Sequence, residues 1–226
     1  MESVGIRLEN VRAGYDDQVA LDGTSCQFAL RRTTAIIGPG GSGKSTLLKL
    51  IAGPPHPPGL WSTGAIKRGC APLALVAQRN PAVAPREAPT SDLDEQRLHA
   101  LWRDGPAGVL DSILQARGAA QAAPCFDTYR LLELSAALAA PERCVLLDEP
   151  TAGLSADARA AVCALLERAR GRRTIIFVSH DLAFTRAVAD DVIFLLDGAI
   201  VEAGTTQTIF ENPARERTRA MIRWGG

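Results

Sequence analysis

The segment Gly38-Pro39-Gly40-Gly41-Ser42-Gly43-Lys44-Ser45-Thr46 matches the phosphate-loop pattern G-x-x-x-x-G-K-[ST]. An apolar run at 33–37 precedes it, and a helical pattern that closes at Gly53 follows it. Glycines let backbone N–H groups converge on phosphate oxygens, and Lys44 supplies positive charge for the β- and γ-phosphates. The Ser45 hydroxyl can ligate Mg²⁺, and the N-terminus of the helix favours an anion. The segment therefore predicts a nucleotide phosphate site between a strand and a helix.

A second acidic motif follows another apolar run. Cys144 to Leu147 is expected to be a buried strand, and Asp148 and Glu149 come directly after it. Asp148 at the carboxyl end of a strand can hold Mg²⁺ directly or through water. Glu149 can orient or deprotonate an attacking water. On its own, this pair serves equally well as the entry to a helix, but the phosphate loop in the same chain favours the catalytic interpretation.

Three further residues are candidates with open alternatives. Gln78 ends a strand expected at 73–77 and can reach Mg²⁺ or the water, although it is also an ordinary loop-entry amide. His180 follows a strand expected at 174–179 and can contact the γ-phosphate, although a lone histidine there is more often structural. Tyr15 can stack on a base or simply pack against its neighbours.

Short apolar strands alternate with helices over most of the chain, which predicts an α/β fold with a parallel sheet covered on both faces. An opening edge strand is expected from Ile6, and Pro- and Gly-rich residues 53–64 are expected to form a loop. Ser155 is expected to cap a helix that stops near Gly171. The other expected elements are strands at 26–30, 192–196 and 200–202, and helices near 92–103, 108–119, 128–140 and from 182.

Composition limits the classes of function. The chain has 226 residues, of which 46% are apolar, and its 25 basic residues equal its 25 acidic ones. This balance argues against a protein that binds nucleic acid through an overall positive charge, though not against a local basic patch. Five scattered cysteines, an odd number, fit a reducing cytosol better than a disulfide framework. We expect neither a signal peptide nor a membrane-spanning helix, so any link to a membrane goes through a partner.

Taken in order, Tyr15, the phosphate loop, Gln78, Asp148-Glu149 and His180 resemble the ATP-binding cassette ATPases of ABC transporters. The run at 137–154 is similar to the family's approach to its second Walker motif. The resemblance implies a single P-loop NTPase domain with a RecA-like core, a small antiparallel β lobe and an inserted α-helical lobe. The core and β lobe would comprise 1–78 and 136–226, and the inserted lobe about 79–135, which would dock on membrane subunits.

The resemblance also implies cofactors and partners. ATP and Mg²⁺ would bind, with Gln78 joining Ser45 and Asp148 around the metal, and with Glu149, His180 and Gln78 serving hydrolysis. The partners would be integral-membrane permease subunits, a second cassette and, indirectly, a solute-binding protein. The chain would then be a peripheral ATPase on the cytoplasmic face of the cell membrane.

Two segments resemble the phosphate-import branch of the family. These are Gln78-Arg-Asn-Pro81 and the tail Gly204-Thr-Thr-Gln-Thr-Ile-Phe-Glu-Asn-Pro213. They imply an importer ATPase for phosphate or a similar small solute. The alternative is a regulatory cassette that binds ATP, pairs with another cassette and turns over weakly. A soluble protein acting on nucleic acid is disfavoured, because this chain has neither a second cassette nor a long coiled-coil insertion.

The chain departs from the family at two motifs, the signature and the D-loop. The family's L-S-G-G-Q signature, which contacts the nucleotide held by the opposite cassette, aligns with Pro124-Cys-Phe-Asp-Thr128. Bulky Phe126 and anionic Asp127 are expected to oppose that approach, by steric hindrance and by charge repulsion. Ser155 stands where the family has an aspartate in its D-loop.

Overall fold

A computed structural model describes residues 4–71, 73–81, 96, 99, 102 and 125–225. The helices expected near 92–103 and 108–119 lie outside the described residues, apart from Gln96, His99 and Trp102, which are helical. Most of the expected inserted lobe therefore lies outside as well. No helix among the described residues is long and apolar enough to cross a membrane.

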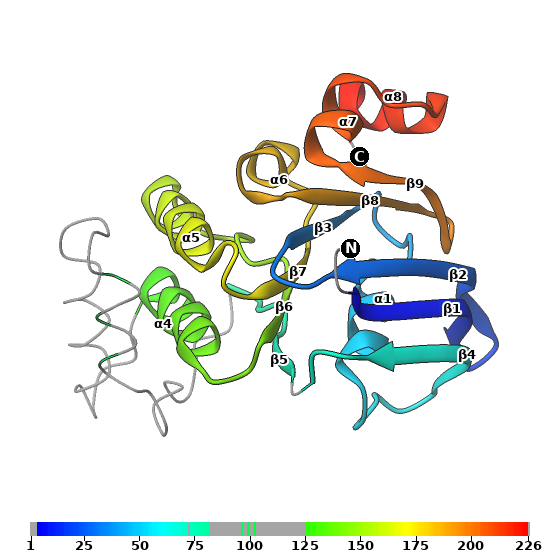
Figure 1. Ribbon diagram of the computed structural model, residues 1–226, viewed down its shortest axis with the longest axis horizontal. Coiled ribbons are helices and arrows are strands. Elements are labelled where there is room, and N and C mark those ends of the chain that lie inside the picture. The colour runs from blue at the N-terminus through cyan, green and yellow to red at the C-terminus, as the bar shows by residue number, and fades with distance from the viewer. Residues whose placement is uncertain are drawn as a thin grey trace.

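The main sheet has six strands in the order β5-β6-β7-β3-β8-β9 (Figure 1). All neighbours are parallel except β8 and β9, which form an antiparallel hairpin. Every residue of β3, β6 and β7 is buried, as expected for strands covered on both faces. The strands are β3 (Thr33–Ile37), β5 (Leu73–Val76), β6 (Cys144–Asp148), β7 (Thr174–Val178), β8 (Asp191–Leu196) and β9 (Ala199–Thr205).

Alternate residues of the central strands enter two apolar clusters on opposite faces of this sheet. Val145 and Leu147 pack with the cluster formed by α4, α5 and α6, whereas Leu146 packs with α1 and the small sheet. This alternation follows from the two-residue period of a strand. The helices are α1 (Lys44–Ala52), α4 (Phe126–Ala139), α5 (Ala156–Ala169), α6 (Leu182–Val188), α7 (Thr206–Glu211) and α8 (Glu216–Trp224).

The small antiparallel sheet corrects two expectations. It has the order β2-β1-β4, with β1 at Val4–Tyr15, β2 at Gln18–Ala29 and β4 at Leu60–Arg68. β1 is therefore the middle strand, not an edge, and residues 60–64 of the expected loop at 53–64 belong to β4. Gly64 explains the second error, because a Cβ there would lie 2.4 Å from the carbonyl oxygen of Asn10. Gly64 thus permits the close approach of β4 to β1 and does not mark a loop.

The helix ends agree with the sequence signals. Gly53 follows α1 with φ of 86°, and Ser155 caps α5 by accepting a hydrogen bond from the Ala158 N–H at 3.3 Å. The helix α4 runs without a break across the expected boundary between inserted lobe and core at 135/136.

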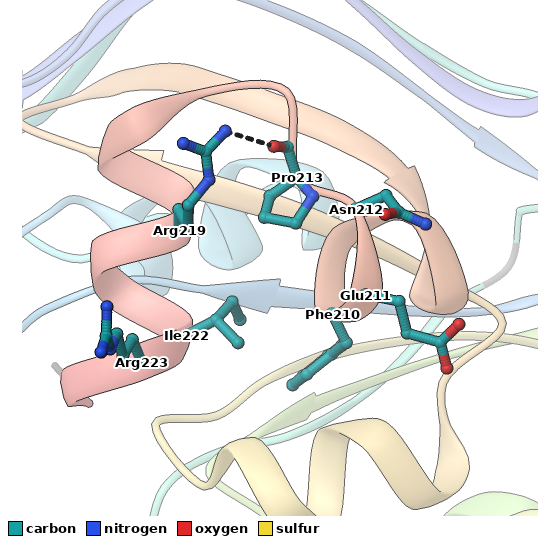
Figure 2. A pocket seen from close by; sticks show the side chains of 7 residues that line it. All are labelled: Phe210, Glu211, Asn212, Pro213, Arg219, Ile222 and Arg223. Atoms are coloured by element: carbon teal, nitrogen blue, oxygen red, sulfur yellow. Dashed lines mark hydrogen bonds between the residues drawn. The ribbon is translucent and has the colours of Figure 1, made fainter.

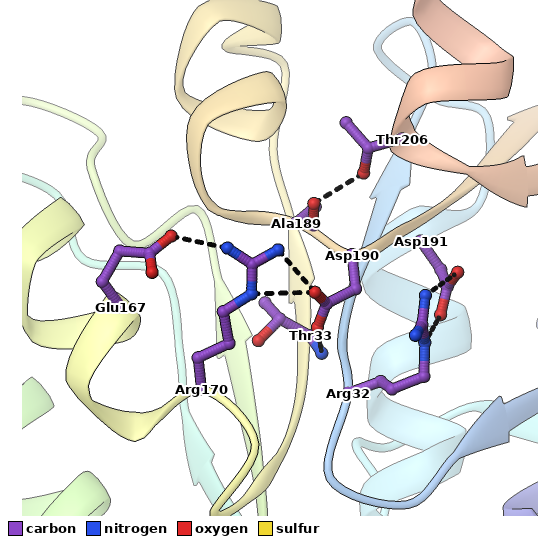
Figure 3. Close-up of polar contacts among 8 residues, drawn as sticks. All are labelled: Arg32, Thr33, Glu167, Arg170, Ala189, Asp190, Asp191 and Thr206. Carbon is purple, nitrogen blue, oxygen red and sulfur yellow. Dashed lines mark hydrogen bonds and ion pairs between the residues drawn. The ribbon is translucent and has the colours of Figure 1, made fainter. Parts of the chain in front are cut away.

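Ion pairs join the strand ends opposite the phosphate loop (Figure 3). Arg170, at the end of α5, binds Asp190 through Nε at 2.8 Å and Nη2 at 2.6 Å, and also binds Glu167. Asp190 in turn accepts a hydrogen bond from the Thr33 N–H at 2.8 Å. These contacts tie α5, β3 and the start of β8 together at one end of the sheet.

Candidate functional site

The phosphate loop lies between β3 and α1, as the sequence predicts. Gly38 has φ of 152°, and a Cβ there would lie 2.1 Å from the carbonyl oxygen of Leu195. A Cβ at Gly43 would lie 2.4 Å from the carbonyl oxygen of Ala20. These two glycines therefore seat the loop against β8 and β2. Around Gly41, by contrast, a Cβ would find no atom within 4 Å, so the middle of the loop is open.

Lys44 curls back over this loop. Its ammonium donates hydrogen bonds to the carbonyl oxygens of Gly38 and Pro39, each at 2.8 Å. Burial lowers the pKa of Lys44, while the nearby carboxylates of Glu149 and Asp148 act in the opposite direction. The two carbonyl oxygens hold a desolvated ammonium group. The oxygens of a bound phosphate could replace them as its hydrogen-bond acceptors.

Ser45 and Asp148 meet at the carboxyl end of β6. The Ser45 hydroxyl donates to Asp148 Oδ1 at 3.2 Å, and Asp148 is buried. Burial is the main cause of a raised pKa for Asp148, and the neighbouring Glu149 adds to it. A hydroxyl and a desolvated carboxylate side by side are hard oxygen ligands, so these two residues fit Mg²⁺.

Glu149 and His180 extend from the ends of two adjacent strands, because Asp148 of β6 pairs with Val178 of β7. His180 Nδ1 lies 3.0 Å from Glu149 Oε2, and the imidazole is 71% exposed whereas Glu149 is buried. Glu149 adopts a left-handed backbone conformation with φ of 46°, which is uncommon for a residue with a side chain. A buried carboxylate beside an exposed imidazole can accept and pass on a proton.

Gln78 and Tyr15 lie at the ends of other strands. Gln78 is exposed two residues beyond β5, the strand that pairs with β6. Tyr15 ends β1, and the Lys49 ammonium of α1 lies 5.8 Å from the centre of its ring and 3.5 Å from its hydroxyl. Tyr15 therefore lies beside α1, the helix that follows the phosphate loop.

The structure adds a residue that sequence reasoning missed. Arg130 of α4 is only 1% exposed, and its guanidinium donates to the carbonyl oxygen of Ala77 at 2.8 Å and to that of Asp148 at 3.1 Å. The available signal was an arginine inside the apolar pattern of a helix, where a charged side chain needs buried partners.

The segment aligned with the family's signature forms the start of α4. Pro124 lies outside the described residues, and Cys125 is the N-cap. Asp127 Oδ2 accepts a hydrogen bond from the Ser155 hydroxyl at 2.5 Å, and Oδ1 lies 3.4 Å from the Ser155 backbone nitrogen. Asp127 and Ser155, which both depart from the family pattern, thus bind each other within one chain.

A separate cavity of about 360 Å³ lies between α7 and α8 (Figure 2). Arg219 on its rim donates to the carbonyl oxygen of Pro213 at 3.2 Å. None of the candidate site residues lines this cavity. It is lined by Phe210, Glu211, Asn212, Pro213, Arg219, Ile222 and Arg223.

Comparison with known proteins identifies relatives of the chain. Residues 21–88 match the ABC transporter family. A probable amino-acid import ATP-binding protein of Bacillus subtilis is 31% identical over 98% of this chain and 97% of its own length. A phosphate import ATP-binding protein of Natronomonas pharaonis is 29% identical over 96% of this chain and 86% of its own length.

A solved structure shares the fold. An ATP-binding cassette of an ABC transporter in its ADP conformation superposes with a TM-score of 0.69. Its sequence is 19% identical, over 96% of this chain and 98% of that one. The expected P-loop NTPase fold is therefore confirmed.

Proposed function

The chain belongs to the family of ATP-binding subunits of ABC transporters, and we propose that it hydrolyses ATP to drive the import of a small solute through partner membrane subunits. The observation that carries the proposal is the meeting of the phosphate loop with Asp148 and Glu149 at one sheet edge. Like the import ATP-binding proteins it resembles, this subunit would act as a peripheral protein on the cytoplasmic face of the cell membrane, held there by permease subunits.

The residues at this edge divide the chemistry among them. Lys44 and the loop amides would bind the phosphates, and Ser45, Asp148 and Gln78 would hold Mg²⁺. Bound Mg²⁺ would neutralise charge that develops on the phosphate oxygens. Glu149 would accept the proton of the attacking water, and His180, 3.0 Å away, would orient that carboxylate. Tyr15 would stack on the adenine.

Phosphate or an amino acid are the solute classes we propose. The tail and Gln78 segments favour phosphate, and a phosphate import relative is 29% identical. A 31% identical relative named for amino-acid import makes that class an equal alternative. The solute would be selected by the membrane subunits and a solute-binding protein, so co-purification of the chain with those subunits, followed by solute-uptake assays, would separate the two.

A regulatory cassette with weak turnover is the second candidate function. It is favoured by Asp127, an anionic residue in the segment that aligns with the signature, which the Ser155 hydroxyl binds within this chain. Such a cassette would bind ATP through its phosphate loop but leave the opposite site incomplete.

Both candidate functions require ATP binding, which calorimetry with Mg-ATP tests. Lys44→Ala removes charge-assisted contacts worth about 1.5–3 kcal/mol each, so ATP binding should weaken at least tenfold. Lys67→Ala is the matched control, because Lys67 lies on β4 and pairs with Glu9 at 3.1 Å. Equal affinity in wild type and Lys44→Ala would refute the assignment of the loop.

A further inference from the structure

Two residues of α4 reach the loop that carries Gln78 and the turn that carries Glu149. We propose that Arg130 and Glu133 are positioning residues that hold Gln78 from both sides and fix the Asp148–Glu149 turn, so that α4 sets both halves of the hydrolytic site together. This inference rests on the proposed function and names the residues that position the catalytic groups of that site.

The guanidinium of Arg130 is buried with partners on three segments. Nη1 donates to the carbonyl oxygen of Ala77 at 2.8 Å and to Glu133 Oε2 at 2.7 Å. Nη2 donates to the carbonyl oxygens of Asp148 at 3.1 Å and Glu149 at 3.4 Å. The ion pair with Glu133 alone would balance the charge. The three carbonyl contacts instead exploit the planar fork, which a lysine ammonium cannot reproduce.

The other oxygen of Glu133 holds the residue beyond Gln78. Arg79 donates to Glu133 Oε1 through Nη2 at 2.8 Å and Nε at 3.2 Å. Gln78 is thus bracketed, because the carbonyl group before it is bound by Arg130 and the side chain after it is bound by Glu133. Both contacts come from one turn of α4, although Gln78 itself is exposed.

The same guanidinium supports the strained turn at Glu149. A left-handed conformation with φ of 46° persists only where surrounding contacts hold it. The Glu149 N–H donates to the carbonyl oxygen of Val178 at 3.0 Å, and Arg130 donates to the carbonyl oxygens of Asp148 and Glu149. Because one guanidinium binds both the Gln78 loop and this turn, a shift of α4 would move Gln78 and Glu149 together.

The test uses the purified full chain and, for turnover, the complex with its membrane subunits and partner cassette. Arg130→Lys keeps the charge but loses the fork. Arg170→Lys is the matched control, because Arg170 makes a similar forked contact to Asp190 at the other end of the sheet (Figure 3). Hydrogen exchange of peptides covering 73–81 and 144–154 reports the two held segments.

In Arg130→Lys we expect exchange to rise in both peptides together, and turnover to fall by about 10–100-fold, as misplaced catalytic groups do. The Kd for ATP measured without Mg²⁺ should stay within about threefold, because the phosphate loop is untouched. Glu133→Gln should raise exchange mainly in 73–81, since Arg130 keeps its carbonyl contacts. Arg170→Lys should change none of these.

Several results would overturn the inference. These are unchanged exchange in Arg130→Lys, a rise in only one peptide, or equal losses of turnover and ATP affinity. If Arg130→Lys fails to fold, the test rests on Glu133→Gln. Hydrogen exchange that stays at the wild-type level in 73–81 of that variant would then refute the claim that α4 holds the residues on both sides of Gln78. A wild-type complex without ATPase activity would refute the proposed function, whereas the exchange result would still judge the positioning role.

Discussion

At the scale of single residues, the two acidic side chains at the end of β6 have different surroundings. Asp148 is buried beside the Ser45 hydroxyl, and this burial raises its pKa. Glu149 turns toward the exposed His180 through a left-handed backbone conformation. Burying a carboxylate next to a hydroxyl costs folding free energy and suits a cation site, whereas a contact with an exposed imidazole suits proton transfer.

Glu149→Gln should retain ATP binding and slow hydrolysis by about 10²–10⁴-fold, the usual range for loss of a general base. The amide keeps the size of the side chain but cannot accept the proton. Steady-state ATPase assays in the transport complex measure the effect, with calorimetry as the control for binding. Turnover at the wild-type rate would remove Glu149 from this role.

Asp148→Asn should stabilise the nucleotide-free chain at neutral pH while abolishing the Mg²⁺ dependence of ATP binding. A carboxyl whose pKa is raised on folding favours the protonated form, so its contribution to stability falls as pH rises through that pKa. Asparagine does not ionise, so the variant avoids this loss of stability, and it still accepts the Ser45 hydrogen bond. Each kcal/mol gained in the free energy of unfolding raises Tm by about 2–4 °C in a chain of this size. Melting curves from acidic to neutral pH should converge at the acidic end, and a lower Tm of the variant at neutral pH would contradict the argument.

At the scale of elements, the starts of α4 and α5 are linked. Ser155 accepts from the Ala158 N–H as the cap of α5 and donates to Asp127 in the first turn of α4. One hydroxyl therefore satisfies a helix end and joins two helices that pack in the same apolar cluster.

Ser155→Ala should lower the free energy of unfolding by about 1 kcal/mol through loss of the cap. Asp127→Ala is the matched comparison, because it leaves the cap in place and removes the acceptor that links the two helices. Denaturant unfolding of both variants measures the difference. An equal loss in the two would show that the link between the helices, and not the cap, carries the stability.

At the scale of the whole molecule, residues distant in sequence gather at one edge of the main sheet. The phosphate loop follows β3, Asp148 ends β6 and His180 follows β7. These three strands are consecutive in the sheet, in the order β6-β7-β3. If the chain pairs head to tail with a second cassette, as we propose, the start of α4, with Phe126 and Asp127, would face the nucleotide held by that partner. This chain would thus offer a complete phosphate loop and an altered signature.

We therefore expect the isolated chain to be a weak ATPase, and its activity to rise strongly when a cassette with an intact signature is added. In that mixture, Lys44→Ala in this chain should abolish the rise, because the gain depends on this chain's phosphate loop. ATPase assays on the chain alone and on both mixtures provide the measurement. Vigorous, cooperative hydrolysis by the isolated chain would show that 124–128 functions as a signature.

The sequence by itself determined the phosphate loop, the apolar strands that precede Asp148 and His180, and the stops of α1 and α5. These features depend on signals within a few residues, such as glycine spacing, strand length and caps. The tertiary structure alone decided that β1 is a central strand, that β4 begins at Leu60, and that Arg130 binds Ala77, Asp148 and Glu149. Strand order and buried hydrogen bonds join residues far apart in the chain, and local periodicity does not encode which distant partners meet.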